Sequence, residues 1–187
     1  MAKIEMPPRM LYTPIFHIDT NLINSRSKLH TMNQMEKWAD DGVILVHMSG
    51  VSFKEAQAGR NAVRTEKALS YIFTMTDEII SSNDPMFRRI EAALFPSGAK
   101  SDGERNDVKI VYEADYYGAI LVTRDGGSRT QPGGILGNRQ KLKDLVQILS
   151  DTEAVEFVRR KINDRDEFNS RVEQEYGYPL PEWTGLD

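Results

Sequence analysis

Four acidic side chains could meet at one edge of a parallel sheet. Asp19 directly follows a short apolar run, and Asp125 lies two residues after the end of another. Glu55 lies on the segment that leaves a third apolar run, and Asp107 begins a helix that leads back into the sheet. Ligands of open parallel sheets bind beyond the carboxyl ends of the strands. We therefore expect these four carboxylates to converge there.

Converging carboxylates need a compensating proton or cation. Two of them at about 5 Å, with an effective dielectric near 20, repel each other by about 3 kcal/mol. Hard oxygen ligands suit Mg²⁺ or Mn²⁺, and such an ion can activate water and stabilise charge on a phosphate. Each acid alone has a simpler explanation as a helix cap, a turn residue or a solvated side chain. Taken together, they favour a metal site.

Short apolar runs alternate with helical patterns along the whole chain. The expected strands are 15–18, 43–46, 119–123 and 145–149. This alternation predicts an α/β fold, a three-layer α/β/α sandwich with a central, mainly parallel sheet of four or five strands.

The helices between these runs carry the usual start and stop residues. We expect a long helix over 60–81, a helix from Pro85 to Phe95 capped at 83–84, and a polar loop over 96–105. Two C-terminal helices are expected, the first opened by the capping box at 150–153.

Composition excludes several classes of protein. The 187 residues include no cysteine, so disulfides, thiolate metal sites and a cysteine nucleophile are ruled out. No apolar stretch reaches about 18 residues, and residues 1–14 lack the apolar run of a signal peptide. We therefore expect a cytoplasmic protein with no membrane span. The net charge of −4 shows no global basic field for nucleic acid.

Three stretches resemble those of a known family. They are Asp19-Thr20-Asn21-Leu22-Ile23, Val51-Ser52-Phe53-Lys54-Glu55, and the segment from Asp107 to Asp125 with its Leu-Val-Thr-Arg-Asp ending. In this order and spacing they resemble the PIN-domain ribonucleases, which include toxins of toxin–antitoxin modules. The resemblance covers about residues 15–149. It implies a PIN-like nuclease domain over 1–150, with a C-terminal helical extension over 151–187 packed on the same domain.

The resemblance also implies roles for individual residues. Those that would bind Mg²⁺ or Mn²⁺ and carry catalysis are Asp19, Glu55, Asp107 and Asp125. Asn21 and Thr123 would be polar supports for them, as groups behind metal ligands often are. Asp115, eight residues after Asp107, is an alternative acid that we expect to be a solvated surface residue.

Two groups of basic residues could contact a phosphate backbone. The first lies in a window whose only acid is Asp125, and its members are Arg124, Arg129, Arg139, Lys141 and Lys143. The second shares one helical face: Arg60, Arg64 and Lys67. An ordinary solvated surface explains either group equally well.

The leading hypothesis is a metal-dependent endoribonuclease that hydrolyses RNA phosphodiester bonds, as the toxin of a toxin–antitoxin pair. Its partners would be RNA, an antitoxin or other protein, and a second copy of the chain. The alternative is a catalytically inactive PIN-like binding module that acts through partner contacts. A phosphohydrolase of the haloacid-dehalogenase type ranks low, because its motif requires a second aspartate where this chain has Asn21.

Overall fold

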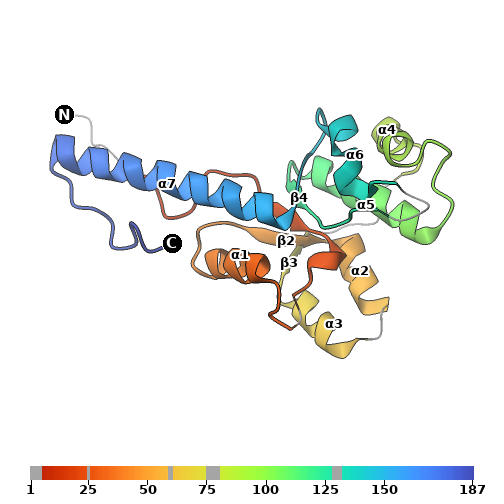
Figure 1. The fold of residues 1–187 in the computed structure, drawn as a ribbon, viewed down its shortest axis with the longest axis horizontal. Helices are drawn as coiled ribbons and strands as arrows, with labels where there is room; N and C mark the ends of the chain where they lie inside the picture. Colours follow the sequence, from red (N-terminus) through yellow and green to blue (C-terminus); the bar gives the residue numbers. More distant parts are fainter. Residues whose placement is uncertain (1–5, 25, 59–60, 75–80, 128–131) are drawn as a thin grey trace.

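The fold is that of an α/β protein built on one parallel sheet (Figure 1). The computed structural model describes residues 6–24, 26–58, 61–74, 81–127 and 132–187. Its strands are β1 (Phe16–Ile18), β2 (Val46–Ser49), β3 (Ile72–Thr74), β4 (Ile120–Val122) and β5 (Gln147–Leu149). They lie in the order β3-β2-β1-β4-β5, and each pairs with its neighbours in parallel. The predicted fold class is confirmed.

Helices cover both faces of this sheet. They are α1 (His30–Asp40), α2 (Gly50–Ala58), α3 (Ala62–Leu69), α4 (Pro85–Leu94), α5 (Asp102–Tyr116), α6 (Gly134–Leu142) and α7 (Asp151–Tyr176), with a short 3-10 helix η1 (Thr20–Leu22). Successive residues of a strand point to opposite faces. In β4, Ile120 and Val122 therefore join the core with α1 and α7, and Leu121 joins the core with α4, α5 and α6.

The sheet differs from expectation at its β2–β3 side. The second strand is shifted from 43–46 to β2, and α2 begins directly after it at Gly50. The predicted long helix over 60–81 is wrong, because α3 ends at Leu69 and β3 follows. Hydrogen bonding to the edge of β2 stabilises this short strand, and the local sequence pattern carries no trace of that partner. Residues 75–80 of the predicted helix lie outside the described residues.

The start of α5 also differs from expectation. The Asp84 cap and the helix at Pro85 agree with the prediction. The loop expected over 96–105 is wrong in its second half, because Ser101 and Glu104 form a capping box that starts α5 at Asp102. Asp107 therefore lies in the second turn of α5 and does not cap it. This moves its side chain from a helix end to a helix face.

The C-terminal region forms one helix where two were expected. Ser150 and Glu153 form the predicted capping box, and α7 then runs for 26 residues to a left-handed Gly177. Its first half packs into the core through Val155 and Val158. Its second half extends away from the sheet (Figure 1). No helix in the part of the chain that the structure describes is long and apolar enough to span a membrane.

Candidate functional site

Asp19 lies directly after β1 and is held by three hydrogen bonds. Its Oδ1 accepts from the backbone N–H of Thr20 at 2.6 Å. Its Oδ2 accepts from the Asn21 side chain and from the Thr123 hydroxyl, each at 2.6 Å. The Asp19 side chain is nearly buried. Its carboxylate therefore has a fixed position at the carboxyl end of β1.

Thr123 and Asn21 connect Asp19 to the segment after β4. The buried Thr123 hydroxyl accepts hydrogen bonds from the Asn21 side chain at 3.2 Å and from the Asp125 N–H at 2.9 Å. Asn21 Oδ1 accepts from the Arg124 N–H at 3.1 Å. Both residues thus contact Asp19 directly, in the positions that supporting residues would need.

Glu55 brings α2 and α5 to the same edge of the sheet. Its Oε2 accepts from the Thr20 hydroxyl at 2.7 Å, and its Oε1 accepts from the Asn106 side chain at 2.8 Å. Sequence reasoning missed Thr20 and Asn106. Each is the immediate neighbour of a predicted ligand, Asp19 or Asp107, and that adjacency was the available signal.

Asp125 stabilises the start of α6. Its Oδ1 accepts from the Gly127 N–H at 3.1 Å and its Oδ2 from the Ile135 N–H at 2.7 Å. Gly134 has a φ of +55°, and a Cβ there would lie 2.4 Å from Asp125 Oδ2. Asp125 therefore acts as a turn residue, one of the simpler explanations considered above for a single acid.

The electrostatics show that the four acids lie close enough to act on one another. Burial, together with the charges of Asp125, Asp19 and Glu55, raises the pKa of Asp107 to about 8. Burial also raises the pKa of Asp19 to about 6, with Glu55 and Asp125 contributing, although hydrogen bonds from Thr123 and Thr20 oppose the rise. These mutual effects place the four acids near one another at one edge of the sheet, where burial and their charges hold the pKa values of Asp107 and Asp19 above the usual range.

The cluster offers oxygen donors to a hard cation without forming a closed cage. Among the described residues, no group of three or more His, Asp or Glu side chains has the spacing of a preformed metal site. Asp107 accepts no hydrogen bond from any described side chain or backbone group, so both its oxygens are available. Carboxylate oxygens are the ligands that Mg²⁺ and Mn²⁺ prefer. By chemistry, Asp19, Glu55, Asp107 and Asp125 could hold such an ion.

The first basic group is largely occupied by contacts within the protein. Arg124 pairs with Asp151, and Arg139 pairs with Glu153 through both carboxylate oxygens. Lys141 donates to the Asn138 side chain at 2.7 Å. These contacts hold α6 and the start of α7, while Arg129 lies outside the described residues.

The second basic group lies on the opposite side of the cluster. Lys67 pairs with Glu36 at 2.8 Å and lies over the ring of Tyr71. Arg64 donates to the backbone oxygen of Thr20, the residue after Asp19. Arg60 is outside the described residues. Of the two described members of this group, Arg64 is the one that contacts the segment beside Asp19.

Asp115 lies in different surroundings from Asp107, although both are on α5. Burial raises the pKa of Asp115, and the neighbouring charges are Arg89, which lowers it, and Asp84, which raises it. These residues belong to α4 and its cap. The side chain is partly buried and not the fully solvated one that we expected.

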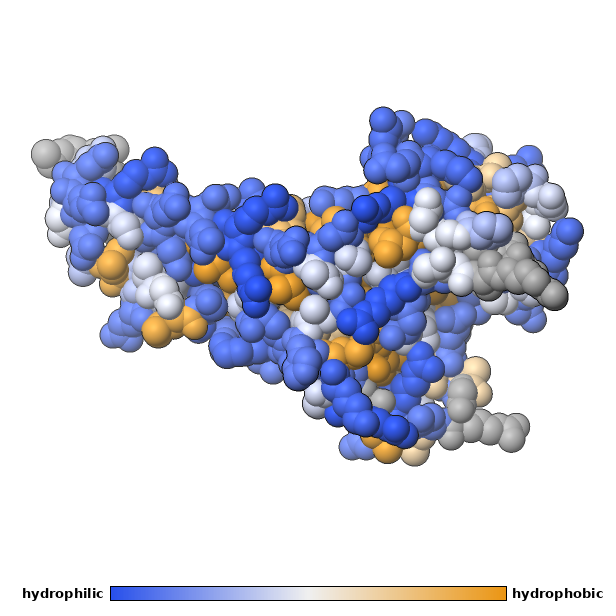
Figure 2. Space-filling view, viewed as in Figure 1, coloured by the Kyte–Doolittle hydropathy of each residue, from blue (hydrophilic) through white to orange (hydrophobic). Residues whose placement is uncertain are grey.

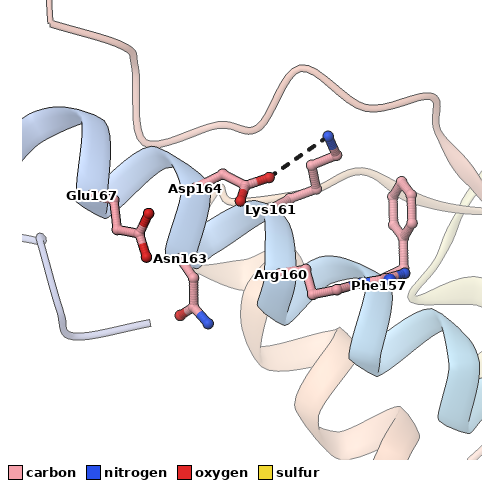
Figure 3. Close-up of a pocket in the computed structure, with 6 residues that line it drawn as sticks. All are labelled: Phe157, Arg160, Lys161, Asn163, Asp164 and Glu167. Atoms are coloured by element: carbon pink, nitrogen blue, oxygen red, sulfur yellow. Dashed lines mark ion pairs between the residues drawn. The ribbon is translucent and has the colours of Figure 1, made fainter.

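A shallow pocket elsewhere is not part of this site. All its lining residues come from α7: Phe157, Arg160, Lys161, Asn163, Asp164 and Glu167 (Figure 3). Lys161 and Asp164 form an ion pair of 3.9 Å beside it. No member of the acidic cluster lines the pocket.

Comparison with known proteins leaves the family open. No protein-family model matches this chain, and no curated protein matches it.

Proposed function

We propose that this chain is a metal-dependent endoribonuclease that hydrolyses RNA phosphodiester bonds at the cluster of Asp19, Glu55, Asp107 and Asp125. The observation that carries this proposal is their convergence from four separate segments on the carboxyl edge of a parallel sheet. The resemblance of the three sequence stretches to PIN-domain ribonucleases supports RNA as the substrate.

The surroundings of the acids suggest different roles for Asp19 and Asp107. Asp19, fixed by three hydrogen bonds, is the rigid ligand, and Asp107, free of hydrogen bonds from the described residues, can adjust to an ion. When bound, Mg²⁺ or Mn²⁺ supplies a water of lowered pKa and stabilises charge on the phosphate. In the metal-free protein the Asp107 carboxyl, with a pKa of about 8, holds a proton near neutral pH, and a cation held beside it would favour the ionised form.

Cleavage of single-stranded RNA in Mn²⁺ tests the proposal. The parent is compared with Asp107→Asn, and the matched control is Asp115→Asn on the same helix. We expect the Asp107 variant to lose cleavage by at least roughly a hundredfold, as the loss of a metal ligand or proton-transfer group does. The control should cut at the parent rate. Equal cleavage by parent and Asp107→Asn, or none by any protein over a broad RNA panel, would contradict the proposal.

A catalytically inactive binding module is the second candidate. It is supported by Asp125, both of whose carboxylate oxygens already accept backbone hydrogen bonds from the α6 segment. Calorimetric titration with Mn²⁺ separates the two functions. Binding at millimolar or lower concentration that Asp107→Asn removes supports the nuclease, whereas no binding supports the inactive module.

We further propose that the protein works in the cytoplasm with a protein partner, either an antitoxin or a second copy of itself. The distal half of α7 offers the contact surface, because Phe168 and Tyr176 are exposed there. Figure 2 shows small hydrophobic spots among mostly hydrophilic residues at the elongated end of the molecule that contains this part of α7. Size-exclusion chromatography with light scattering would detect self-association, and Phe168→Asp should weaken it.

A further inference from the structure

Arg64 reaches the carboxylate edge from α3. Its guanidinium donates to the backbone oxygen of Thr20, and the Thr20 hydroxyl donates to Glu55 at 2.7 Å. Asn61 fixes the helix that carries it, because its side chain accepts from the Arg64 N–H at 3.1 Å. The guanidinium is therefore bonded to Thr20, the residue that follows Asp19 and that also donates a hydrogen bond to Glu55.

The charge of Arg64 is not compensated by a described ion pair. Its one described side-chain partner is a neutral carbonyl. Arg124, Arg139 and Lys67, by contrast, each pair with a carboxylate at 2.5–2.8 Å. A guanidinium has five N–H donors, and the bond to Thr20 uses one of them. Donors for an anionic group therefore remain on a partly exposed side chain.

We propose that Arg64 binds a phosphate of the substrate strand and positions the neighbouring phosphodiester at the carboxylates. This inference rests on the proposed function. Arginine suits the role because its planar fork binds phosphate oxygens through two parallel hydrogen bonds. Its bond to Thr20 orients the fork before substrate arrives, which lowers the entropy lost on binding.

The position of Arg64 determines the path of the strand. A strand held by Arg64 and by the cluster crosses the α2–α3 side of the sheet edge. The α6 side is less suitable, because Arg124 and Arg139 are engaged by Asp151 and Glu153. Binding there would require those ion pairs to open. The sequence placed the basic group that contains Arg124 and Arg139 first and the Arg64 group second, and the ion pairs favour the Arg64 side instead.

Salt dependence distinguishes phosphate binding from a merely structural role. If Arg64 only holds the Thr20 backbone, its loss disturbs Glu55 but leaves the number of phosphate contacts unchanged. If Arg64 binds a phosphate, its replacement lowers by one the number of phosphates that the protein neutralises, and fewer counterions are released from the RNA on binding. For a single strand, the slope of log(1/KM) against log salt then becomes shallower by about 0.7.

The experiment compares the parent with Arg64→Ala, Arg64→Lys and Arg160→Ala. The last is the control, because Arg160 is an exposed arginine on the first half of α7, outside both the acidic cluster and the proposed contact surface. Cleavage of a labelled single-stranded oligoribonucleotide in Mn²⁺ is measured at several salt concentrations. Fluorescence anisotropy measures binding of the same oligoribonucleotide, calorimetry measures Mn²⁺ affinity, and circular dichroism verifies folding.

We expect Arg64→Ala to raise KM by roughly tenfold or more, as loss of a charge-assisted hydrogen bond does, with kcat and Mn²⁺ affinity nearly unchanged and the slope reduced. Arg64→Lys should keep the slope and recover part of KM. Arg160→Ala should behave as the parent. An Arg64→Ala protein that matches the control, or that loses activity with an unchanged slope, overturns the inference while the nuclease function stands.

The two proposals fail separately. If the parent does not cleave RNA, the proposed function fails, and anisotropy then decides the inference. Oligoribonucleotide binding that Arg64→Ala weakens and Arg160→Ala keeps supports Arg64 as a phosphate-binding residue. Binding that is equal in all variants, or absent in the parent, overturns it.

Discussion

The Thr123 hydroxyl donates a 2.6 Å hydrogen bond to Oδ2 of Asp19, although the two residues are 104 positions apart. The register of β1 and β4 makes this contact possible. Ile18 pairs with Val122 at the ends of the two strands, so the residues that follow them, Asp19 and Thr123, lie side by side. A slip of one residue would turn these side chains to opposite faces. The site is therefore a direct consequence of parallel pairing.

Replacing Thr123 tests the value of this contact. Thr123→Val keeps the shape of the side chain but leaves Asp19 Oδ2 and the Asp125 N–H each short of one hydrogen bond. We expect the free energy of unfolding to fall by about 1–3 kcal/mol. Urea unfolding at pH 7 measures it. Thr152→Val, exposed in the first turn of α7, is the control and should change it by less than about 0.5 kcal/mol. Equal effects of the two changes would show that the contact is unimportant.

Ionisation of Asp107 should make the metal-free protein less stable as pH rises. Its pKa is about 8 in the folded chain and near 4 in the unfolded chain. Between these values the folded state holds a proton that the unfolded state has released, so the free energy of unfolding decreases with increasing pH. Asp19 adds to this decrease between about pH 4 and pH 6.

Asp107→Asn should remove the larger part of that dependence. Urea unfolding in EDTA at pH 5 and pH 8.5 should give a smaller difference for this variant than for the parent. Asp144→Asn, a change at an exposed position after α6, is the control and should follow the parent. Parallel pH profiles for all three proteins would show that Asp107 is not the group responsible.

Two glycines of α6 form a matched pair for testing the Asp125 turn. An alanine Cβ at Gly134 would lie 2.4 Å from Asp125 Oδ2 and from the Gly127 nitrogen, at a φ of +55°. We expect Gly134→Ala to lower the free energy of unfolding by more than about 1 kcal/mol. Gly137 has open space around it, so Gly137→Ala should stabilise by up to about 1 kcal/mol. Thermal unfolding distinguishes them, and equal shifts would contradict the described turn.

Glu113 is a buried acid outside the cluster. Its carboxylate, on α5, has no hydrogen bond of good geometry, and burial raises its pKa to about 7, although the nearby Ser49 hydroxyl and Gly50 amide oppose the rise. Its ionisation therefore costs stability between about pH 4.5 and pH 7. Glu113→Gln should be more stable than the parent at pH 8, with a smaller difference at pH 5. Glu156→Gln, exposed on α7, is the control. A variant less stable than the parent at pH 8 would contradict this account.

Several features could be predicted from the sequence because they depend on local chemistry. The Asp84 cap before Pro85, the Ser150 capping box and the apolar runs that become β1 and β4 all use neighbouring residues alone. The position of Asp19 after β1 followed from the same reasoning.

Other features depended on partners distant in sequence. β3 forms because β2 presents an edge to it, and a pattern of three residues does not reveal that edge. Arg124 looked available for phosphate in the sequence, but α7 brings Asp151 against it.

The sequence by itself determined the α/β class and the choice of the four acids as candidate ligands, because strand ends and helix caps depend on neighbouring residues alone. Only the tertiary structure decided how those acids are supported: Thr123 holds Asp19, Asn106 holds Glu55, and backbone amides hold Asp125. It also decided that Arg64 lies beside them without a described carboxylate partner. The reason is physical, because these contacts join segments up to 104 residues apart and exist only once the strands have paired.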